Sequence, residues 1–182
     1  MPSADSWIDK APPRVGFSVF RPTLLAGATP FFVAAMSGHT DVMRALVQAG
    51  ADPLKTTKER MTPLMAAAGV GRVLAETRLA ADATLEAAKL AWELGNDVNA
   101  ANAAGETALH GAALTRSDAL VQFLVDHGAA LNATNRRGET PLMIAERTVS
   151  AGSAPVFVRT STGDLLRRLG AIVTPPPPAA RP

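Results

Sequence analysis

The chain repeats itself four times in register, and this repetition constrains its fold more than any other feature. Four threonines open the copies, at Thr29, Thr62, Thr107 and Thr140, so successive openings lie 33, 45 and 33 residues apart. The middle spacing equals the same period with an insertion of 12 residues. A period of this length indicates one supersecondary unit per copy. Such units are stabilised by stacking, because a single unit cannot bury its apolar faces alone.

Each copy carries the signals of two short helices. The opening threonine suits a helix N-cap, and in three copies a proline follows it at the first helical position. Farther along, apolar residues recur at helical spacing, as Val42, Leu46 and Val47 do in the first copy. A glycine ends the second helix, where a left-handed residue is favoured. These glycines are Gly50, Gly95, Gly128 and Gly170, and extended fingers follow three of them at 52–61, 98–106 and 131–139.

The amino-acid pattern of the copies resembles that of the ankyrin repeat. The openings read ATPFFVAA (28–35), TPLMAAA (62–68), GETALHGAA (105–113) and GETPLMIA (138–145), and the closings read GAD (50–52), LGNDVN (94–99), HGAALN (127–132) and LGA (169–171). The resemblance covers residues 27–171 and implies an all-α, ankyrin-type solenoid of stacked helix–turn–helix units with β-hairpin-like fingers. The motif histidine survives only at His110, and Phe32, Met65 and Met143 replace it in the other copies.

The resemblance divides the chain into three parts. We expect residues 1–27 to form an enlarged first finger, with the alternative that they are the remnant of a preceding repeat in a longer array. The repeat domain spans 28–171, with repeats at about 28–60, 61–105, 106–138 and 139–171, and residues 172–182 form a Pro-rich tail. Insertions at 71–83 and 148–160 fall between the helices of the second and fourth copies. They are either lengthened loops or a ridge beside a binding surface.

Composition and motifs exclude several kinds of chemistry. The 182 residues contain no cysteine, which excludes disulfides, thiolate zinc sites and cysteine nucleophiles. The net charge of +2 is too small to indicate nucleic acid or an anionic membrane as the main partner, and the apolar runs are too short to span a bilayer. The motifs of zinc hydrolases, P-loops and serine hydrolases are missing. We therefore expect no enzyme activity, no cofactor and no metal.

The three histidines are predicted to have structural roles. At the position of His110, the resemblance implies hydrogen bonds that tie neighbouring units together. His39 belongs to the glycine–histidine turn between two helices. His127 lies near the end of a helix, where a positively charged imidazole is favourable.

The resemblance implies that a concave face, lined by the fingertips and the inner helices, binds other proteins. Exposed Met36, Met61, Val70 and Leu114 are expected to supply apolar anchors, as the centre of an interface requires. Basic residues gather at both ends of the row of fingertips. The complete set of candidate binding residues is Met36, Ser37, Lys55, Lys58, Arg60, Met61, Val70, Asn102, Glu106, Leu114, Thr115, Asn135, Arg136, Arg137 and Glu139.

Two hypotheses of function follow from these observations. The first is a non-enzymatic scaffold, monomeric, that binds a protein partner on the concave face and has neither nucleic acid nor membrane as a partner. The alternative is a regulatory or docking segment of a larger multidomain enzyme or sensor. The sequence specifies no compartment: the cytoplasm is the default, and the periplasm would follow if the chain is a fragment of a longer exported protein. The bias toward alanine, arginine and proline favours a bacterial origin.

Overall fold

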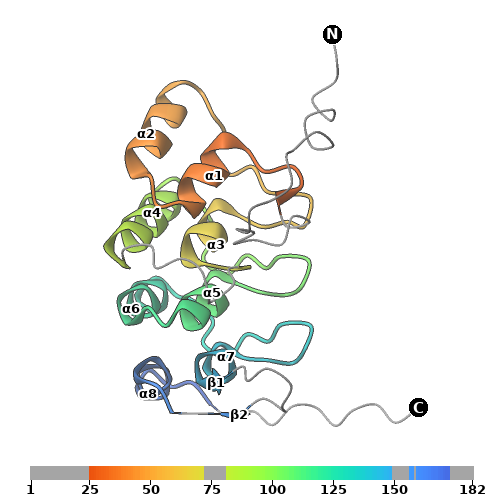
Figure 1. Ribbon diagram of the computed structural model, residues 1–182, viewed down its shortest axis with the longest axis vertical. Coiled ribbons are helices and arrows are strands. Elements are labelled where there is room, and N and C mark those ends of the chain that lie inside the picture. The colour runs from red at the N-terminus through yellow and green to blue at the C-terminus, as the bar shows by residue number, and fades with distance from the viewer. Residues whose placement is uncertain (1–24, 72–80, 149–155, 158, 173–182) are drawn as a thin grey trace, which may run out of the picture.

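The helices of the chain stack in pairs along one axis (Figure 1). A computed structural model describes residues 25–71, 81–148, 156–157 and 159–172. Over these residues the elements are α1 (Pro30–Met36), α2 (Thr40–Gln48), α3 (Pro63–Ala68), α4 (Ala81–Glu93), α5 (Ala108–Thr115), α6 (Asp118–Asp126), α7 (Pro141–Glu146), β1 (Arg147–Thr148), β2 (Val156–Phe157) and α8 (Ser161–Arg168). The predicted all-α repeat fold is confirmed.

The helices form two layers. The first helices of the units, α1, α3, α5 and α7, make the inner layer, and the second helices, α2, α4, α6 and α8, make the outer layer. The finger loops project on the side of the inner layer, away from the outer helices (Figure 1). Every unit therefore presents an inner helix and a fingertip on the same side of the stack.

The opening threonines start the inner helices, as their N-cap chemistry predicts. In three units the hydroxyl oxygen accepts a hydrogen bond from the amide three residues later, from Phe32 to Thr29 (3.1 Å), from Met65 to Thr62 (3.1 Å) and from Met143 to Thr140 (3.3 Å). In the third unit, Thr107 Oγ1 bonds His110 Nδ1 at 2.9 Å. The unit that keeps the motif histidine thus pairs it with its threonine in a capping box.

Each finger is a small hairpin, and neighbouring fingers are joined through their backbones. The hairpins close through amide-to-carbonyl bonds from Thr57 to Met61, from Asn102 to Glu106 and from Asn135 to Glu139, at 3.0–3.1 Å. Between fingers, the amides of Lys58, Ala103 and Arg136 donate to the carbonyls of Ala26, Glu59 and Ala104, at 2.8–2.9 Å. These bonds repeat with the period of the sequence and set the register of the fingertips.

Small residues fill the positions where inner helices meet. Ala35, Ala67 and Ala112 have no exposed surface. At Gly111 in α5 a side chain would not fit, because a Cβ there would lie 2.7 Å from the backbone nitrogen of Val70. The abundance of alanine therefore reflects close approach between stacked units, and larger apolar side chains pack between the two layers.

The fourth unit differs from the others in how its two helices pack. Glu146, at the end of α7, replaces the alanine of the preceding units (Ala35, Ala68 and Ala113). Its buried carboxylate accepts bonds from both terminal nitrogens of Arg167 in α8, with Nη2 at 2.8 Å from Oε2. A Cβ at Gly163 would lie 2.7 Å from Glu146 Oε1, so this glycine leaves the room that the ion pair needs.

Several predicted segments lie wholly or partly outside the described residues. These are the first 24 residues of the N-terminal segment, residues 72–80 of the first insertion, residues 149–155 and 158 of the second, and 173–182 of the tail. The end of the first insertion is helical, since α4 begins at Ala81 and has 13 residues, against 9 in α2 and in α6. Around the second insertion, β1 and β2 form a short antiparallel pair that places Arg147 opposite Phe157.

Candidate protein-binding surface

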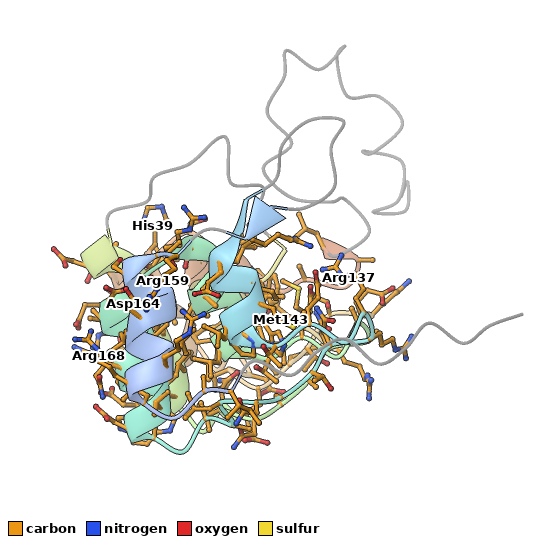
Figure 2. All side chains as sticks on the ribbon, turned by 90° about the horizontal axis from the view of Figure 1, so that it is seen from below. His39, Arg137, Met143, Arg159, Asp164 and Arg168 are labelled. Carbon is orange, nitrogen blue, oxygen red and sulfur yellow. The ribbon has the colours of Figure 1, made fainter. Side chains whose placement is uncertain are left out.

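The fingertips and the inner helices together form one surface, here called the inner face. The residues that were predicted from the sequence to bind a partner belong to these elements. Lys55, Lys58 and Arg60 on the second finger and Arg136 and Arg137 on the fourth are exposed. Viewed along the stack, Arg137 lies on the finger side, whereas Arg159, Asp164 and Arg168 lie near α8 in the outer layer (Figure 2). The basic fingertip residues are therefore separate from the charged cluster around α8.

Two of the four expected apolar anchors are buried, and the expectation of exposure was wrong for them. Met61 has 0% and Val70 2% of its surface exposed. Both belong to a small core with Phe32, Met65 and Ala66, which fills the space between the first two inner helices and their fingers. Met61 takes the place that a glutamate has in the third and fourth fingers, and its apolar side chain turns into this core.

The asparagines Asn102 and Asn135 were also expected on the binding surface, but they are 2% and 6% exposed. Asn102 Oδ1 accepts bonds from the amides of Ala104 (2.8 Å) and Glu106 (2.9 Å), and its Nδ2 donates to Glu106 Oε2 (3.0 Å). Asn135 makes the same three bonds in the fourth finger. These side chains hold the finger turns in shape, so they contribute to the inner face by positioning its backbone.

The other candidates on the inner helices are partly exposed. Met36 and Ser37 end α1, and Leu114 and Thr115 end α5. The Thr115 hydroxyl donates to the carbonyls of Gly111 (3.0 Å) and Ala112 (3.2 Å), so its polar atom is already used within α5. Met36 and Leu114 are thus the two expected apolar anchors that remain accessible.

A hollow of about 50 Å³ opens on the inner face between the second, third and fourth units. Apolar side chains and the bare backbone of two glycines line one part of it, and charged groups line the rest. Its lining residues are Val70, Gly71, Glu106, His110, Gly111, Leu114, Arg137, Ile144 and Arg147. This volume exceeds the ~10–15 Å³ that one water needs, so the hollow admits the tip of a side chain.

Charged residues beside the hollow form a connected network. Glu139 accepts from Arg147 Nη1 at Oε1 (2.6 Å) and from Arg137 Nε at Oε2 (2.7 Å), and Arg137 Nη2 lies 3.7 Å from Glu106 Oε1. Burial opposes the charged form of Glu139, but the bond from Asn135 and the charges of Arg137 and Arg147 outweigh it and lower its pKa. The network therefore presents fixed charges of both signs. Arg147 was not among the residues predicted for this surface, because it lies between the end of α7 and the extension at 148–160, where the repeating pattern stops.

His110 joins the third unit to the fourth, which confirms the structural role predicted for it. Its Nδ1 accepts from the Thr107 amide (3.1 Å), which leaves the proton on Nε2 to donate to the Glu139 carbonyl (3.2 Å). Burial lowers the pKa of His110 below its ordinary value of 6.5, although the Glu139 carbonyl and nearby carboxylates favour the charged form. A neutral imidazole bridging two units is a structural element of the hollow's wall.

On the outer layer, the structure brings together an aromatic cluster that the sequence did not predict. Trp92 of α4 lies edge-on to Phe123 of α6 and to His127, with ring centroids 6.0 and 4.0 Å away. His127 Nδ1 donates to the Phe123 carbonyl at 2.7 Å. The three residues belong to different copies or have different repeat positions, so their periodicity gives no sign that they meet.

Within the described ranges, no group of three or more histidine, aspartate or glutamate side chains is arranged to hold a metal ion. A helix long and apolar enough to cross a membrane is likewise not found among these residues. Beside the hollow, the charged groups of Glu106, Arg137, Glu139 and Arg147 are paired with one another. This geometry defines a class of protein: a helical repeat protein whose unit-to-unit contacts build one continuous surface.

Comparison with known proteins shows to which family this helical repeat protein belongs. Residues 18–83 and 78–154 match the family described as ankyrin repeats (3 copies), and together these matches exceed half of the chain. The chain belongs to the ankyrin repeat family, whose members generally mediate protein–protein interactions and are typically non-enzymatic.

The curated relatives share only a short segment with this chain. Diacylglycerol kinase iota of Mus musculus, Rattus norvegicus and Homo sapiens is in each case 52% identical over 48 residues. That segment is 26% of this chain and 4% of each kinase. The similarity therefore concerns a short segment of these relatives and leaves most of their length unmatched.

Proposed function

We propose that this chain is a non-enzymatic interaction module that binds a protein partner on its inner face. The observation that carries the proposal is the hollow between the second, third and fourth units. There the partly exposed Leu114 lies beside buried Ile144, and the charges of Glu106, Arg137 and Arg147 adjoin them. Protein interfaces commonly combine an apolar centre with a polar rim in this way.

The arrangement of the surrounding groups supports the same proposal. The inner helices are held in a fixed register by the finger-to-finger bonds, and His110 and the Glu139 network link the third and fourth units. A surface fixed before binding loses little conformational freedom when a partner docks. A partner side chain that enters the hollow would meet apolar atoms and fixed charges without rearranging the stack.

A variant of Leu114 tests this proposal. Leu114→Glu places a carboxylate next to Glu106 in the hollow, and we expect it to lower the recovery of specific partners by about tenfold, as the loss of a central contact does. The measurement is quantitative affinity purification with the full chain from the organism that encodes it. Met61 is unsuitable for this test because its substitution would disrupt the core.

The matched control is Ala119→Glu, which adds the same charge on α6 in the outer layer, where Ala119 is exposed. We expect this variant to retain the partners. Equal recovery by the Leu114→Glu chain, with its circular dichroism spectrum unchanged, would contradict binding at the hollow.

The second candidate function is a docking or regulatory segment of a larger enzyme. It is favoured by the relatives, because their matched segment is 4% of a kinase. It also draws on the first unit, where Val33 and Val42 are 42% and 48% exposed, while Ala66 and Leu120 at the corresponding positions of later units are buried. The genomic reading frame upstream of Met1 tests it: a continuous open frame is expected, and an in-frame stop directly upstream would contradict it.

A further inference from the structure

Arg60 has a backbone conformation that glycine adopts in the other fingers. Its φ is +58°, and the equivalent positions two residues before Thr29, Thr107 and Thr140 are Gly27, Gly105 and Gly138. A side chain in this left-handed region crowds the backbone, so a non-glycine residue there is uncommon. Backbone strain of this kind is often associated with a function.

The Arg60 side chain makes few stabilising contacts in the folded chain. The guanidinium is exposed, and its Nη2 reaches the Asn102 carbonyl only at 3.5 Å, at the outer limit of a hydrogen bond. No ion pair of Arg60 is found among the described residues. The charge of Arg60 is therefore available to a partner.

Further cations occupy the same row of fingertips. The three residues at each tip are Lys58, Glu59 and Arg60 on the second finger, Ala103, Ala104 and Gly105 on the third, and Arg136, Arg137 and Gly138 on the fourth. The backbone bonds between fingers fix these tips in register. Lys58 and Arg136 are exposed at equivalent positions, and neither side chain forms an ion pair within the part of the chain that the structure describes.

The third tip forms a low gap between the two basic tips, because no side chain there is larger than a methyl group. Stacked helices are separated by ~8–10 Å, so the second and fourth tips lie ~16–20 Å apart along the stack. An extended chain spans that distance in about five or six residues. The spacing suits an extended peptide better than a compact acidic surface.

We propose that the fingertip row binds an extended acidic segment of the protein partner, with one carboxylate cluster on Lys58 and Arg60 and a second on Arg136. This inference rests on the proposed function, since it names the chemistry of the partner at the same face. Glu59 at one tip and Glu106 and Glu139 beside the others disfavour a nucleic-acid backbone, whose phosphates are continuous. Separate carboxylate clusters avoid these glutamates.

The test uses the full chain and a fluorescein-labelled peptide with two glutamate triplets separated by about three Gly, Ser and Ala residues, which places the triplet centres about six residues apart. Fluorescence anisotropy measures the affinity. We expect the affinity to fall as the salt rises from about 50 to about 500 mM. We also expect weaker binding of a peptide that keeps only one of the two glutamate triplets, because it reaches only one tip at a time.

Arg60→Gly is the decisive variant, and Arg116→Gly is its matched control. Arg116 also has a left-handed φ, +54°, but it lies at the C-terminal end of α5, away from the fingertips. We expect Arg60→Gly to weaken peptide binding about threefold and Arg60→Gly with Arg136→Ala about tenfold, while Arg116→Gly leaves it unchanged. Both glycine variants relieve backbone strain, so their urea midpoints should rise, which separates lost affinity from lost folding.

Two results would overturn the inference. One is equal peptide affinity for the Arg60→Gly and Arg116→Gly chains. The other is binding of a single-stranded oligonucleotide that is as tight as that of the peptide and equally sensitive to Arg60→Gly, which would make the row a phosphate-binding surface. Neither result bears on the hollow around Leu114, so the proposed function stands or falls by its own test.

Discussion

Single residues adapt one repeating backbone to different chemical tasks, and the third position of the inner helices shows this best. Phe32 and Met65 at this position are buried apolar residues, and Met143 is partly exposed. His110 at the same position joins two units through the Glu139 carbonyl. A position that is only a packing site in the other units thus holds a titratable group in the third unit.

We predict that His110 lowers the stability of the fold in mild acid. Because burial lowers the pKa of His110 below 6.5, the unfolded chain takes up this proton first as the pH falls. The free energy of unfolding should decrease from about pH 6.5 downward, until the lower pKa of the folded state is reached. Above that window His110 contributes no pH dependence. Urea unfolding at about pH 7.5, 6.5 and 5.5 measures the effect.

The variant His110→Met carries the residue that two other units have at this position, and it should remove this dependence. His39 and His127 remain in both chains and cancel in the comparison. The lowered pKa of Glu139 acts in a separate window, since its stabilisation is lost only as the pH falls below about 4.5. If both chains lost equal stability between pH 6.5 and 5.5, His110 would not be the source.

At the scale of helices and fingers, contacts between neighbouring elements override local preferences. Gly111 lies inside α5, where glycine is a poor helix former. Its position faces the backbone at Ala68 and Val70, which end the preceding inner helix, and these atoms leave no space for a Cβ. The packing of α5 against α3 therefore determines the residue, at the expense of helix propensity.

We predict that Gly111→Ala destabilises the chain although alanine favours helices. The gain in propensity is about 1 kcal/mol, whereas forcing an atom against rigid backbone costs about 1–3 kcal/mol. The net free energy of unfolding should fall by up to about 2 kcal/mol, measured by urea denaturation.

Gly128→Ala is the comparison variant for this prediction. A Cβ at Gly128 would meet nothing within 4 Å, and only its φ of +85° opposes a side chain. It therefore reports backbone strain without crowding. A Gly111→Ala chain more stable than the natural one would show that α3 and α5 separate easily.

At the scale of the whole molecule, hydrogen bonds join each described repeat unit to the next unit along the chain. Asn99, in the third finger, links this finger to the turn after α6, since its Nδ2 donates to the Gly128 carbonyl (2.9 Å) and its Oδ1 accepts from the Ala130 amide (2.8 Å). The equivalent Asn132 accepts from the Ile172 amide (3.0 Å). In such an array, stability depends on each unit and on its interfaces with its neighbours.

We predict that Asn99→Ala weakens the coupling between units more than it weakens any one unit. Losing two exposed hydrogen bonds should lower the free energy of unfolding by about 1 kcal/mol. Hydrogen exchange should show the loss of protection mainly in the helices from α5 to α8, on the far side of the weakened junction.

Gln122→Ala is the control for this prediction, because it removes a hydrogen bond to Asp126 within α6 alone. We expect it to leave the protection of α7 and α8 unchanged. Uniform loss of protection across all helices of the Asn99→Ala chain would contradict local coupling and indicate that the stack unfolds as a single unit.

Local chemistry made much of this fold predictable. The helix starts at Thr29, Thr62 and Thr140 follow from the bonding of a hydroxyl to an amide three residues away, and the left-handed helix ends at Gly50 and Gly95 follow from the missing Cβ. These interactions lie within a few residues of chain, so the residue types alone indicate them. The ankyrin fold and its family follow from their repetition.

The binding surface was less predictable, because exposure depends on neighbours that are distant in sequence. Met61 and Val70 occupy repeat positions typical of surface residues, but they meet Phe32 and Met65 in a core between two units. An asparagine such as Asn102 is typical of an exposed turn, yet its side chain is buried and forms its hydrogen bonds within its own finger.

The sequence by itself determined the period, the helix boundaries set by threonine and glycine, and hence the family. Only the tertiary structure decided which side chains face solvent, how Arg147 joins the Glu139 network, and that Arg60 has the left-handed backbone of its glycine counterparts. The physical reason is that a repeating sequence encodes the contacts that recur in every unit. The contacts that distinguish one unit from the next arise where side chains of different units meet.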